Sequence, residues 1–509
     1  MLVARSRLTP LAFAGRVARR LAALTTVAIL LFGPAPLVGA EPNRAAGVEM
    51  PTGGAPLPPT EGATKSAEGE PPTETPARRQ RGVQGEAAVS EEQPLRAWHF
   101  AEGNSRHEFQ TFFSVLNLSD RPASVTANYH REDGIRMVQW LGVEPRSRVS
   151  LDVGEIVGQH AFGASFAADE DVVVERSTTW GPDQHAETTL GFAPNGKRAW
   201  HFAEGTTRGR VTTFFVTQNL SDVPATVRAT FTRDDGSREQ RSVTLPPRGR
   251  EAFRMNDLLR NTAFAASFTA DQDVVVERTI LNEGPVGVLG GFGYAPTGPE
   301  AGARAWDFAE GSTRQPYATY FIVFNPNPEP TDVRLLFRLD GGVTRKHRLS
   351  LPPFGRLAID PREIVPAADF ATSIVADRPI VAERSYSSSG DGLFGALGYT
   401  PTADRRNSRT WYFADGNTGG QTETFFVLAN LSDRSAEVRA SFFADDGKSR
   451  DHAMTIPAGG RLSIRANDLV SERAFASRFL ADRDIAVERT VYFGGRGGFT
   501  SFGAGAGRP

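Results

Sequence analysis

The octapeptide Arg96-Ala-Trp-His-Phe-Ala-Glu-Gly103 decides the architecture, because it returns three times along the chain. It recurs as Arg198-Ala-Trp-His-Phe-Ala-Glu-Gly205, Arg304-Ala-Trp-Asp-Phe-Ala-Glu-Gly311 and Arg409-Thr-Trp-Tyr-Phe-Ala-Asp-Gly416. Its tryptophans Trp98, Trp200, Trp306 and Trp411 lie 102, 106 and 105 residues apart. Self-similarity at a fixed period is the signature of a repeat protein. The 509 residues therefore contain four copies of one unit.

Two further sets of residues keep the same three spacings. One is a Glu-Arg pair: Glu175-Arg176, Glu277-Arg278, Glu383-Arg384 and Glu488-Arg489. The other is a single asparagine: Asn117, Asn219, Asn325 and Asn430. Agreement at three separate places divides the chain into units 96–197, 198–303, 304–408 and 409–509.

Within a unit, the pattern is typical of short β-strands. Trp98 and Phe100 alternate with His99, Val172-Val-Val-Glu-Arg176 is β-branched, and Asp133-Gly134 is a hairpin signal. Seven or eight strands in about 100 residues predict an all-β fold, with one immunoglobulin-like β-sandwich in each unit. Half a unit is also about the size of a propeller blade, so a β-propeller is the alternative.

One or two helical turns are expected at a matching place in three of the units. Asp360-Pro361-Arg362-Glu363 offers an N-cap, a proline at the first helical position and a glutamate in the first turn. Asn256-Asp257 and Asn467-Asp468 occupy matching positions, so the same turn is predicted there.

The motifs Trp-x-Phe-Ala-Glu-Gly, Asn-Leu-Ser-Asp and Ala-Asp-x-Asp-Val-Val-Val-Glu-Arg resemble those of tandem sandwich modules in secreted bacterial proteins, a group of unknown function. The resemblance covers residues 96–509 and implies a fold and export more than an activity. The third copy departs from it, because Asn325-Pro-Asn-Pro replaces Asn-Leu-Ser-Asp.

The chain ahead of the repeats has two parts. Residues 1–20 hold five arginines and no acid, residues 21–32 are mostly apolar, and Val38-Gly39-Ala40 supplies small residues for cleavage. This pattern predicts a signal peptide over 1–40, too short to be a membrane anchor. Residues 41–95 contain nine prolines, nine glutamates and no aromatic residue, which predicts a disordered linker.

Composition excludes several classes of function. The chain has no cysteine, which removes disulfides, thiol nucleophiles and Cys-ligated metals. Its formal charge of −2 becomes −7 once the five leader arginines are removed, so nucleic acid is not an expected partner. No phosphate-binding loop, nucleophile elbow or zinc motif is present, and no second apolar stretch approaches spanning length. We therefore expect no catalytic residue, metal or cofactor, and no membrane span in the mature chain.

The repeated acids Glu102, Glu204, Glu310 and Asp415 share the strand parity of the preceding aromatic residues. Together with the Glu-Arg pairs they have two interpretations. Paired carboxylates could act as the acid and base of a glycosidase. A fold-fixing ion pair recurs in every copy more naturally than an active site does, so we predict that Glu102 lies near Arg176. Neighbours on a regular strand face opposite ways, so Glu175 and Arg176 should not both be inside.

Three other motifs have structural explanations. Asn117-Leu-Ser119, Asn219-Leu-Ser221 and Asn430-Leu-Ser432 match the glycosylation sequon, but they are also good turn chemistry. Asp169 and Asp171, with Asp271 and Asp273, lack the rest of a calcium loop and are expected to be turn acids. Trp140 and Trp180 occur in the first unit only. Exposed aromatic residues can stack on sugars, but single exposed aromatic residues are common and need no functional explanation.

These observations favour an exported, non-catalytic protein with a structural, adhesive or scaffolding role, located in the periplasm, at the cell surface or outside the cell. A carbohydrate- or cell-wall-binding array that gains strength by multivalency is the first alternative. A glycoside hydrolase is the second. The expected partners are a polysaccharide or a cell-envelope protein.

Overall fold

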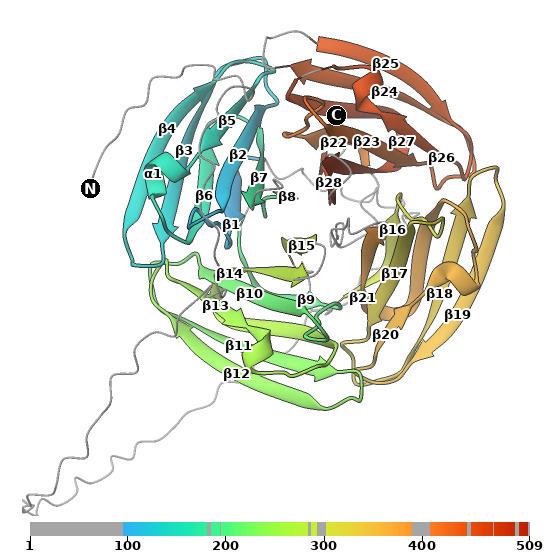
Figure 1. The fold of residues 1–509 in the computed structure, drawn as a ribbon, viewed down its shortest axis with the longest axis horizontal. Coiled ribbons are helices and arrows are strands. Elements are labelled where there is room, and N and C mark those ends of the chain that lie inside the picture. Colours follow the sequence, from blue (N-terminus) through green and yellow to red (C-terminus); the bar gives the residue numbers. More distant parts are fainter. Residues whose placement is uncertain are drawn as a thin grey trace, which may run out of the picture. The chain divides into compact units, whose positions relative to one another are not determined.

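The computed structural model describes residues 95–180, 185–193, 195–282, 287–292, 302–388, 408–444, 449–471, 473–493 and 498–506. The expected signal peptide (1–40) and residues 41–94 of the expected linker lie outside the described residues. The described residues form four repeated β modules, numbered 1 to 4 along the chain (Figure 1). The prediction of an all-β chain of tandem sandwiches is confirmed.

Module 1 consists of two antiparallel sheets. Their strand orders are β1-β6-β3-β4 and β5-β2-β7-β8. This is a sandwich architecture like that of immunoglobulin domains, with a strand order of its own. The elements are β1 (Ala97–Phe100), β2 (Gln110–Asn117), β3 (Ala123–Arg131), β4 (Arg136–Val143), β5 (Arg148–Asp152), α1 (Gly154–Val157), β6 (Phe162–Ala168), β7 (Val172–Trp180) and β8 (His185–Leu190).

Modules 2 to 4 repeat this plan with one change: a single strand of 19 residues replaces β6 and β7. Its first half pairs with the first and third strands of the module, and its second half pairs with the second strand. The two sheets of a module therefore share one long strand.

The strands of module 2 are β9 (Lys197–Phe202), β10 (Val211–Asn219), β11 (Ala225–Arg233), β12 (Arg238–Leu245), β13 (Arg250–Arg254), β14 (Phe264–Asn282) and β15 (Gly287–Phe292). Those of module 3 are β16 (Ala303–Phe308), β17 (Tyr317–Phe324), β18 (Thr331–Leu339), β19 (Thr344–Leu351), β20 (Arg356–Ile359) and β21 (Phe370–Ser388). Those of module 4 are β22 (Ser408–Phe413), β23 (Thr422–Ala429), β24 (Ala436–Ala444), β25 (Ser449–Ile456), β26 (Arg461–Arg465), β27 (Phe475–Phe493), β28 (Gly498–Phe502) and β29 (Ala504–Ala506).

The predicted helical turns are present as 3-10 turns: η1 (Met255–Asp257), η2 (Pro361–Glu363) and η3 (Ala466–Asp468). In η2, the Asp360 side chain accepts a hydrogen bond from the backbone N–H of Arg362, as an N-cap does. The helices in the described part of the chain are these turns and the four-residue α1, and none of them is long enough to cross a membrane.

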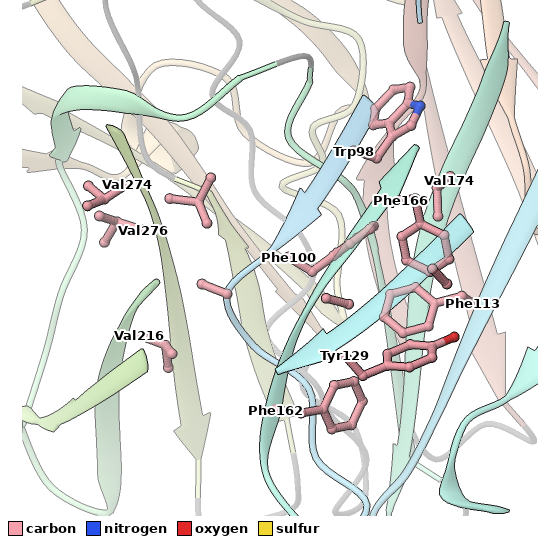
Figure 2. Packing of buried hydrophobic residues seen from close by; sticks show 14 of the residues in the cluster. Trp98, Phe100, Phe113, Tyr129, Phe162, Phe166, Val174, Val216, Val274 and Val276 are labelled. Atoms are coloured by element: carbon pink, nitrogen blue, oxygen red, sulfur yellow. The ribbon is translucent and has the colours of Figure 1, made fainter. Parts of the chain in front are cut away.

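Phenylalanine builds the core of each sandwich. In module 1 the rings of Phe100 and Phe166, on neighbouring strands of one sheet, lie 4.9 and 4.8 Å from that of Phe113 on the facing sheet, and Tyr129 and Phe162 extend the cluster (Figure 2). Edge-to-face contacts of this kind add to the gain from burying aromatic surface. Two sheets of module 1 face each other across this aromatic core, which is the arrangement of a sandwich, whereas a propeller blade is a single sheet.

The glycine that ends the octapeptide is required by close packing. A Cβ at Gly205 would lie 2.6 Å from the ring of Phe264, a fully buried residue, and the same contact occurs in the other three modules. We expect Gly205→Ala to lower the free energy of unfolding by about 1–3 kcal/mol because it overpacks the core. The control is Gly142→Ala, where a Cβ meets nothing within 4 Å and a change below about 0.5 kcal/mol is expected. Guanidinium titration measures both, and equal effects would contradict the packing argument.

Candidate functional site: the contact between successive modules

Arg176 joins module 1 to module 2. Its guanidinium is fully buried, and Nη1 lies 2.8 Å from Oε2 of Glu277 in module 2. The same nitrogen donates to the backbone carbonyl of Glu102, at the end of the octapeptide. Nη2 donates to Glu187 on β8, 3.1 Å away. One guanidinium therefore holds two segments of its own module and a carboxylate of the next.

Glu277 in turn holds the backbone of module 1. Its Oε1 accepts hydrogen bonds from the backbone N–H groups of Ala101 (2.6 Å) and Glu102 (3.0 Å). A carboxylate that accepts from two N–H groups and a guanidinium has most of its lone pairs satisfied, as a buried charge requires.

A second arginine, Arg250 on β13, completes the contact from the side of module 2. Its Nε donates to the carbonyl of Ala101 (2.7 Å), and its Nη2 donates to the carboxylate of Glu102 (2.6 Å). Sequence reasoning missed this residue. Arg148, Arg250, Arg356 and Arg461 keep the repeat spacings of 102, 106 and 105 residues, so the signal was available.

The same contact joins module 2 to module 3 and module 3 to module 4. Arg278 and Arg384 each place Nη1 2.6 Å from the carboxylate of the next module, on Glu383 and Glu488 respectively. The other bonds are Ala203 N–Glu383 (2.9 Å), Glu204 N–Glu383 (3.0 Å), Ala309 N–Glu488 (2.6 Å), Glu310 N–Glu488 (3.2 Å), Arg356–Glu204 (2.6 Å) and Arg461–Glu310 (3.0 Å).

Module 4 makes the contact with module 1, so the four contacts form a closed cycle. Arg489 bonds Glu175 through both Nη1 (3.0 Å) and Nη2 (3.2 Å), and the backbone N–H of Asp415 donates to Glu175 (2.6 Å). Arg148 of module 1 donates to the carboxylate of Asp415 at 3.0 Å. Each module is held by both of its neighbours in this cycle.

The ion pair predicted between the side chains of Glu102 and Arg176 needs correction. The two residues are in contact, but Arg176 binds the backbone carbonyl of Glu102 rather than its carboxylate. The carboxylate of Glu102 pairs with Arg250, and Arg176 pairs with Glu277 as well as Glu187. The reasoning from one unit could not supply a partner that lies in the next.

Glu175 and Arg176 are both buried, contrary to the expectation for neighbours on a strand. They do face opposite ways: the guanidinium of Arg176 lies 5.8 Å from the ring of Phe100, whereas Glu175 faces module 4. The second face of β7 is covered by another module instead of water. The run Val172-Val173-Val174 is buried on both faces for the same reason.

Small residues let the modules approach closely. Ala309 and Ala371 of module 3 pack against Val427, Ala429 and Ala486 of module 4 in one buried cluster. Between modules 1 and 2, a Cβ at Gly163 would lie 2.3 Å from the side chain of Gln218.

The closing contact differs from the other three in having an aspartate. Asp415 has one methylene fewer than Glu102, and hydroxyl groups of module 1 reach it: Ser177 at 2.9 Å and Ser114 at 3.2 Å. The positions matching Ser114 hold Val216, Ile322 and Val427. Burial favours the neutral acid, but Arg148 and Arg489 outweigh it, and the pKa of Asp415 is lowered.

The four glutamates of the cycle behave differently. Burial raises the pKa of Glu175, Glu277, Glu383 and Glu488, and the arginine and N–H donors oppose the shift. Taking these charges out of water therefore costs much of what the pairing returns.

Two histidines lie beside the contacts. His201 on β9 bonds Ser267 at 2.9 Å, and burial lowers its pKa to about 4. Burial, with the nearby charges of Arg136 and Arg248, lowers the pKa of His130 to about 4 as well. Both rings are therefore neutral at pH 7.

The remaining signature residues hold strands and turns. Each signature tryptophan is buried and donates its indole N–H to a backbone carbonyl, in module 1 that of Val172 at 2.8 Å. Matching bonds are Trp200–Val274, Trp306–Ile380 and Trp411–Ile485.

The repeated asparagine is fully buried in every module: Asn117, Asn219, Asn325 and Asn430. Its side chain accepts a hydrogen bond from the backbone N–H two residues later, as turn asparagines do.

The four acids considered for calcium also bind the protein itself. Asp169 and Asp271 accept from the backbone N–H groups of Ser124 (2.7 Å) and Thr226 (2.8 Å). Asp171 pairs with Arg96 (3.3 Å), and Asp273 pairs with Arg198 (3.4 Å). Within the described ranges, no group of three potential metal ligands comes together.

The two tryptophans that occur in the first module only have different surroundings. Trp180 stacks on Phe109, whereas Trp140 is 51% exposed.

Breaking one member of a buried pair should destabilise the protein strongly. Arg384→Met leaves the carboxylate of Glu488 buried without its cation, so we expect a loss of about 3–5 kcal/mol in the free energy of unfolding. Adding Glu488→Gln removes that charge and keeps an oxygen for the two N–H donors, so part of the loss is recovered. The control Asp377→Asn breaks an exposed pair with Arg334 and should cost under about 1 kcal/mol. Additive effects of the two buried substitutions would contradict the ion-pair argument.

The buried histidine predicts a pH dependence. Because the pKa of His201 is depressed in the folded state, its contribution is complete above its ordinary pKa of 6.5 and is lost as pH falls toward 4. We expect His201→Gln to flatten the fall in stability between pH 6.5 and 4, measured by urea unfolding at several pH values. His452→Gln, in a less buried position on β25, is the control. An unchanged slope in the His201 variant would contradict the prediction.

Comparisons with known proteins give no family. No family model matches the chain, and no curated protein sequence matches it. Thermotoga maritima 1070 is 17% identical with a TM-score of 0.19, covering 20% of this chain and 96% of that one. The Anabaena sensory rhodopsin transducer is 22% identical with a TM-score of 0.16, covering 17% and 100%. A tetra-tandem repeat from the extending region of a large adhesion protein is 12% identical with a TM-score of 0.11, covering 77% and 93%. At these TM-scores the similarities carry no argument, and the fold rests on the strand pairing described above.

Proposed function

We propose that the protein is an exported, non-catalytic scaffold with a structural or adhesive role. In it, four covalently linked sandwich modules form one assembly. The observation that carries the proposal is the use of the repeated charges. Glu277, Glu383, Glu488 and Glu175 are almost wholly buried, and each is bound by a neighbouring module. The sequence features that first suggested paired catalytic acids are thereby accounted for by assembly.

Export and kinship are part of the same proposal. The basic and apolar segments of residues 1–40 support a cleaved leader, and the repeat motifs support kinship with sandwich modules of secreted bacterial proteins. A closed cycle of modules held by buried ion pairs suits a protein that has no cysteine and cannot use disulfides outside the cell.

A saccharide-binding role is the second candidate, favoured by the exposed indole of Trp140. The cross-strand position of Trp140 is taken by Ser242, Arg348 and Ala453 in the other modules. Four like aromatic sites acting together are therefore less well supported than one private site in module 1.

The proposed export predicts the N-terminal residue of the mature protein. Expressed from its full coding sequence in a bacterial host, the protein should be found outside the cytoplasm with Glu41 as its first residue, as determined by mass spectrometry of the intact chain. Recovery from the cytoplasm with residues 1–40 attached would contradict export.

The functional part is tested with isolated cell-envelope fractions. We expect the full chain to bind an envelope protein or polysaccharide and to leave it chemically unchanged. Binding of polysaccharide that is lost in Trp140→Ala but kept in the control Ser242→Ala would favour the second candidate. Release of sugar fragments that is abolished by Glu102→Gln would overturn the non-catalytic proposal.

A further inference from the structure

Strand β4 is an unprotected edge. It lies at the end of the sheet β1-β6-β3-β4, and no described strand pairs with its outer side. An exposed edge strand offers a row of free N–H and C=O groups to another strand, and proteins usually blunt such edges with charges or proline. The question is whether β4 carries these devices.

The equivalent strands of the other modules carry them and β4 does not. Strands β12, β19 and β25 each hold several charged side chains, and they are followed by Pro246, Pro352 and Pro457. Strand β4 (Arg136–Val143) has a single charged residue, Arg136, and its proline, Pro145, comes one residue later, after Glu144. Three modules are thus protected against edge pairing where the first is open to it.

The phase of the backbone fixes which residues face the free edge. Arg131 of β3 donates to the carbonyl of Ile135, and β3 and β4 then pair in antiparallel register. Because the hydrogen-bonding direction alternates along a strand, odd-numbered residues of β4 bond to β3 and even-numbered residues point away from it. Val138, Trp140 and Gly142 therefore present their N–H and C=O groups to the open edge.

We propose that β4 pairs antiparallel with β4 of a second copy of this chain, in a register centred on Trp140. Trp140 then lies opposite Trp140 of the second copy, Val138 opposite Gly142, and Arg136 opposite Glu144. Val138, Trp140 and Gly142 supply the free backbone groups of this pairing, whereas Glu144 lies just beyond the strand, where its carbonyl accepts from Ser147 and only its side chain takes part. Their side chains share one face of the extended sheet.

Charge complementarity selects this partner and this register. Arg136 and Glu144 are both exposed. In an antiparallel pairing with two-fold symmetry, Arg136 of each copy faces Glu144 of the other copy, so two ion pairs form. In the monomer the guanidinium of Arg136 donates to the neutral amide oxygen Oδ1 of Asn128 (3.1 Å). The nearby carboxylate of Asp222 accepts from Arg248 (2.8 Å), so Arg136 can turn to a carboxylate of the second copy without breaking an ion pair of its own. The same register on β19 would place Arg348 of one copy directly opposite Arg348 of the other.

Shape and apolar surface agree with the pairing. Trp140 in mid-strand and Ile135 at the turn end of this hairpin are its two large apolar side chains that are about half exposed, at 51% and 49%. A Cβ at Gly142 would meet nothing within 4 Å, so space beside the indole is open for the facing residue. An edge contact of this size is small for a protein interface, and we expect a dissociation constant on the order of micromolar.

The test measures the oligomeric state of the full chain by sedimentation velocity and light scattering over a range of concentrations. A dimer is expected. Arg136→Glu alone and Glu144→Arg alone each bring like charges together twice, and each should weaken the dimer about tenfold or more. The double reversal Arg136→Glu/Glu144→Arg restores opposite charges and should restore dimerisation.

The control is Arg238→Glu at the matching position of β12, which should leave the dimer unchanged. Trp140→Lys introduces a charge at the centre of the pairing and should give a monomer. Acrylamide quenching of the exposed indole should also fall as the concentration of the unmodified chain rises. A chain that stays monomeric up to roughly 100 μM, or a dimer that either single reversal leaves intact, overturns the proposal. So does a double reversal that fails to rescue, provided that the variants unfold in urea like the unmodified chain.

Discussion

The pairing of a buried guanidinium with a buried carboxylate of a neighbouring module is the interaction on which the rest of the structure depends. An arginine taken out of water without a counterion would be strongly destabilising, and so would the glutamate. In this chain neither charge is neutralised fully within its own module. The modules are therefore coupled, because each supplies the counterion of a buried charge in its neighbour. The pair of Arg489 with Glu175 closes the cycle, so each of these four arginines has a glutamate of a neighbouring module.

The features of the fold that were predictable came from local chemistry. The aromatic alternation at Trp98 and Phe100, the turn asparagines and the capped turn at Asp360 are all decided by neighbours within a few residues or within one sandwich. The repeat spacing gave the number of modules. These signals are strong because the hydrophobic pattern and the turn chemistry agree with each other.

Most residues of the site were predicted from the sequence, but the way in which they pair was not. The signature glutamates and arginines are the contact residues, but reasoning within one unit assigned Arg176 to the wrong carboxylate. The valine run before Glu175 was a usable sign, because a strand with one solvated face alternates and this strand does not. The second arginine, Arg250, was missed because attention stayed on conspicuous motifs, although its spacing matches theirs.

Fusion of the four modules into one polypeptide has a consequence for stoichiometry. Four identical subunits around an axis must display every surface feature four times, whereas these modules diverge independently outside their contacts. Asp415 with Ser114 shows that even one contact has acquired a sequence of its own. The indole of Trp140 accordingly appears once per chain, so a partner that binds this edge meets one site on each chain, whereas four identical subunits would offer four.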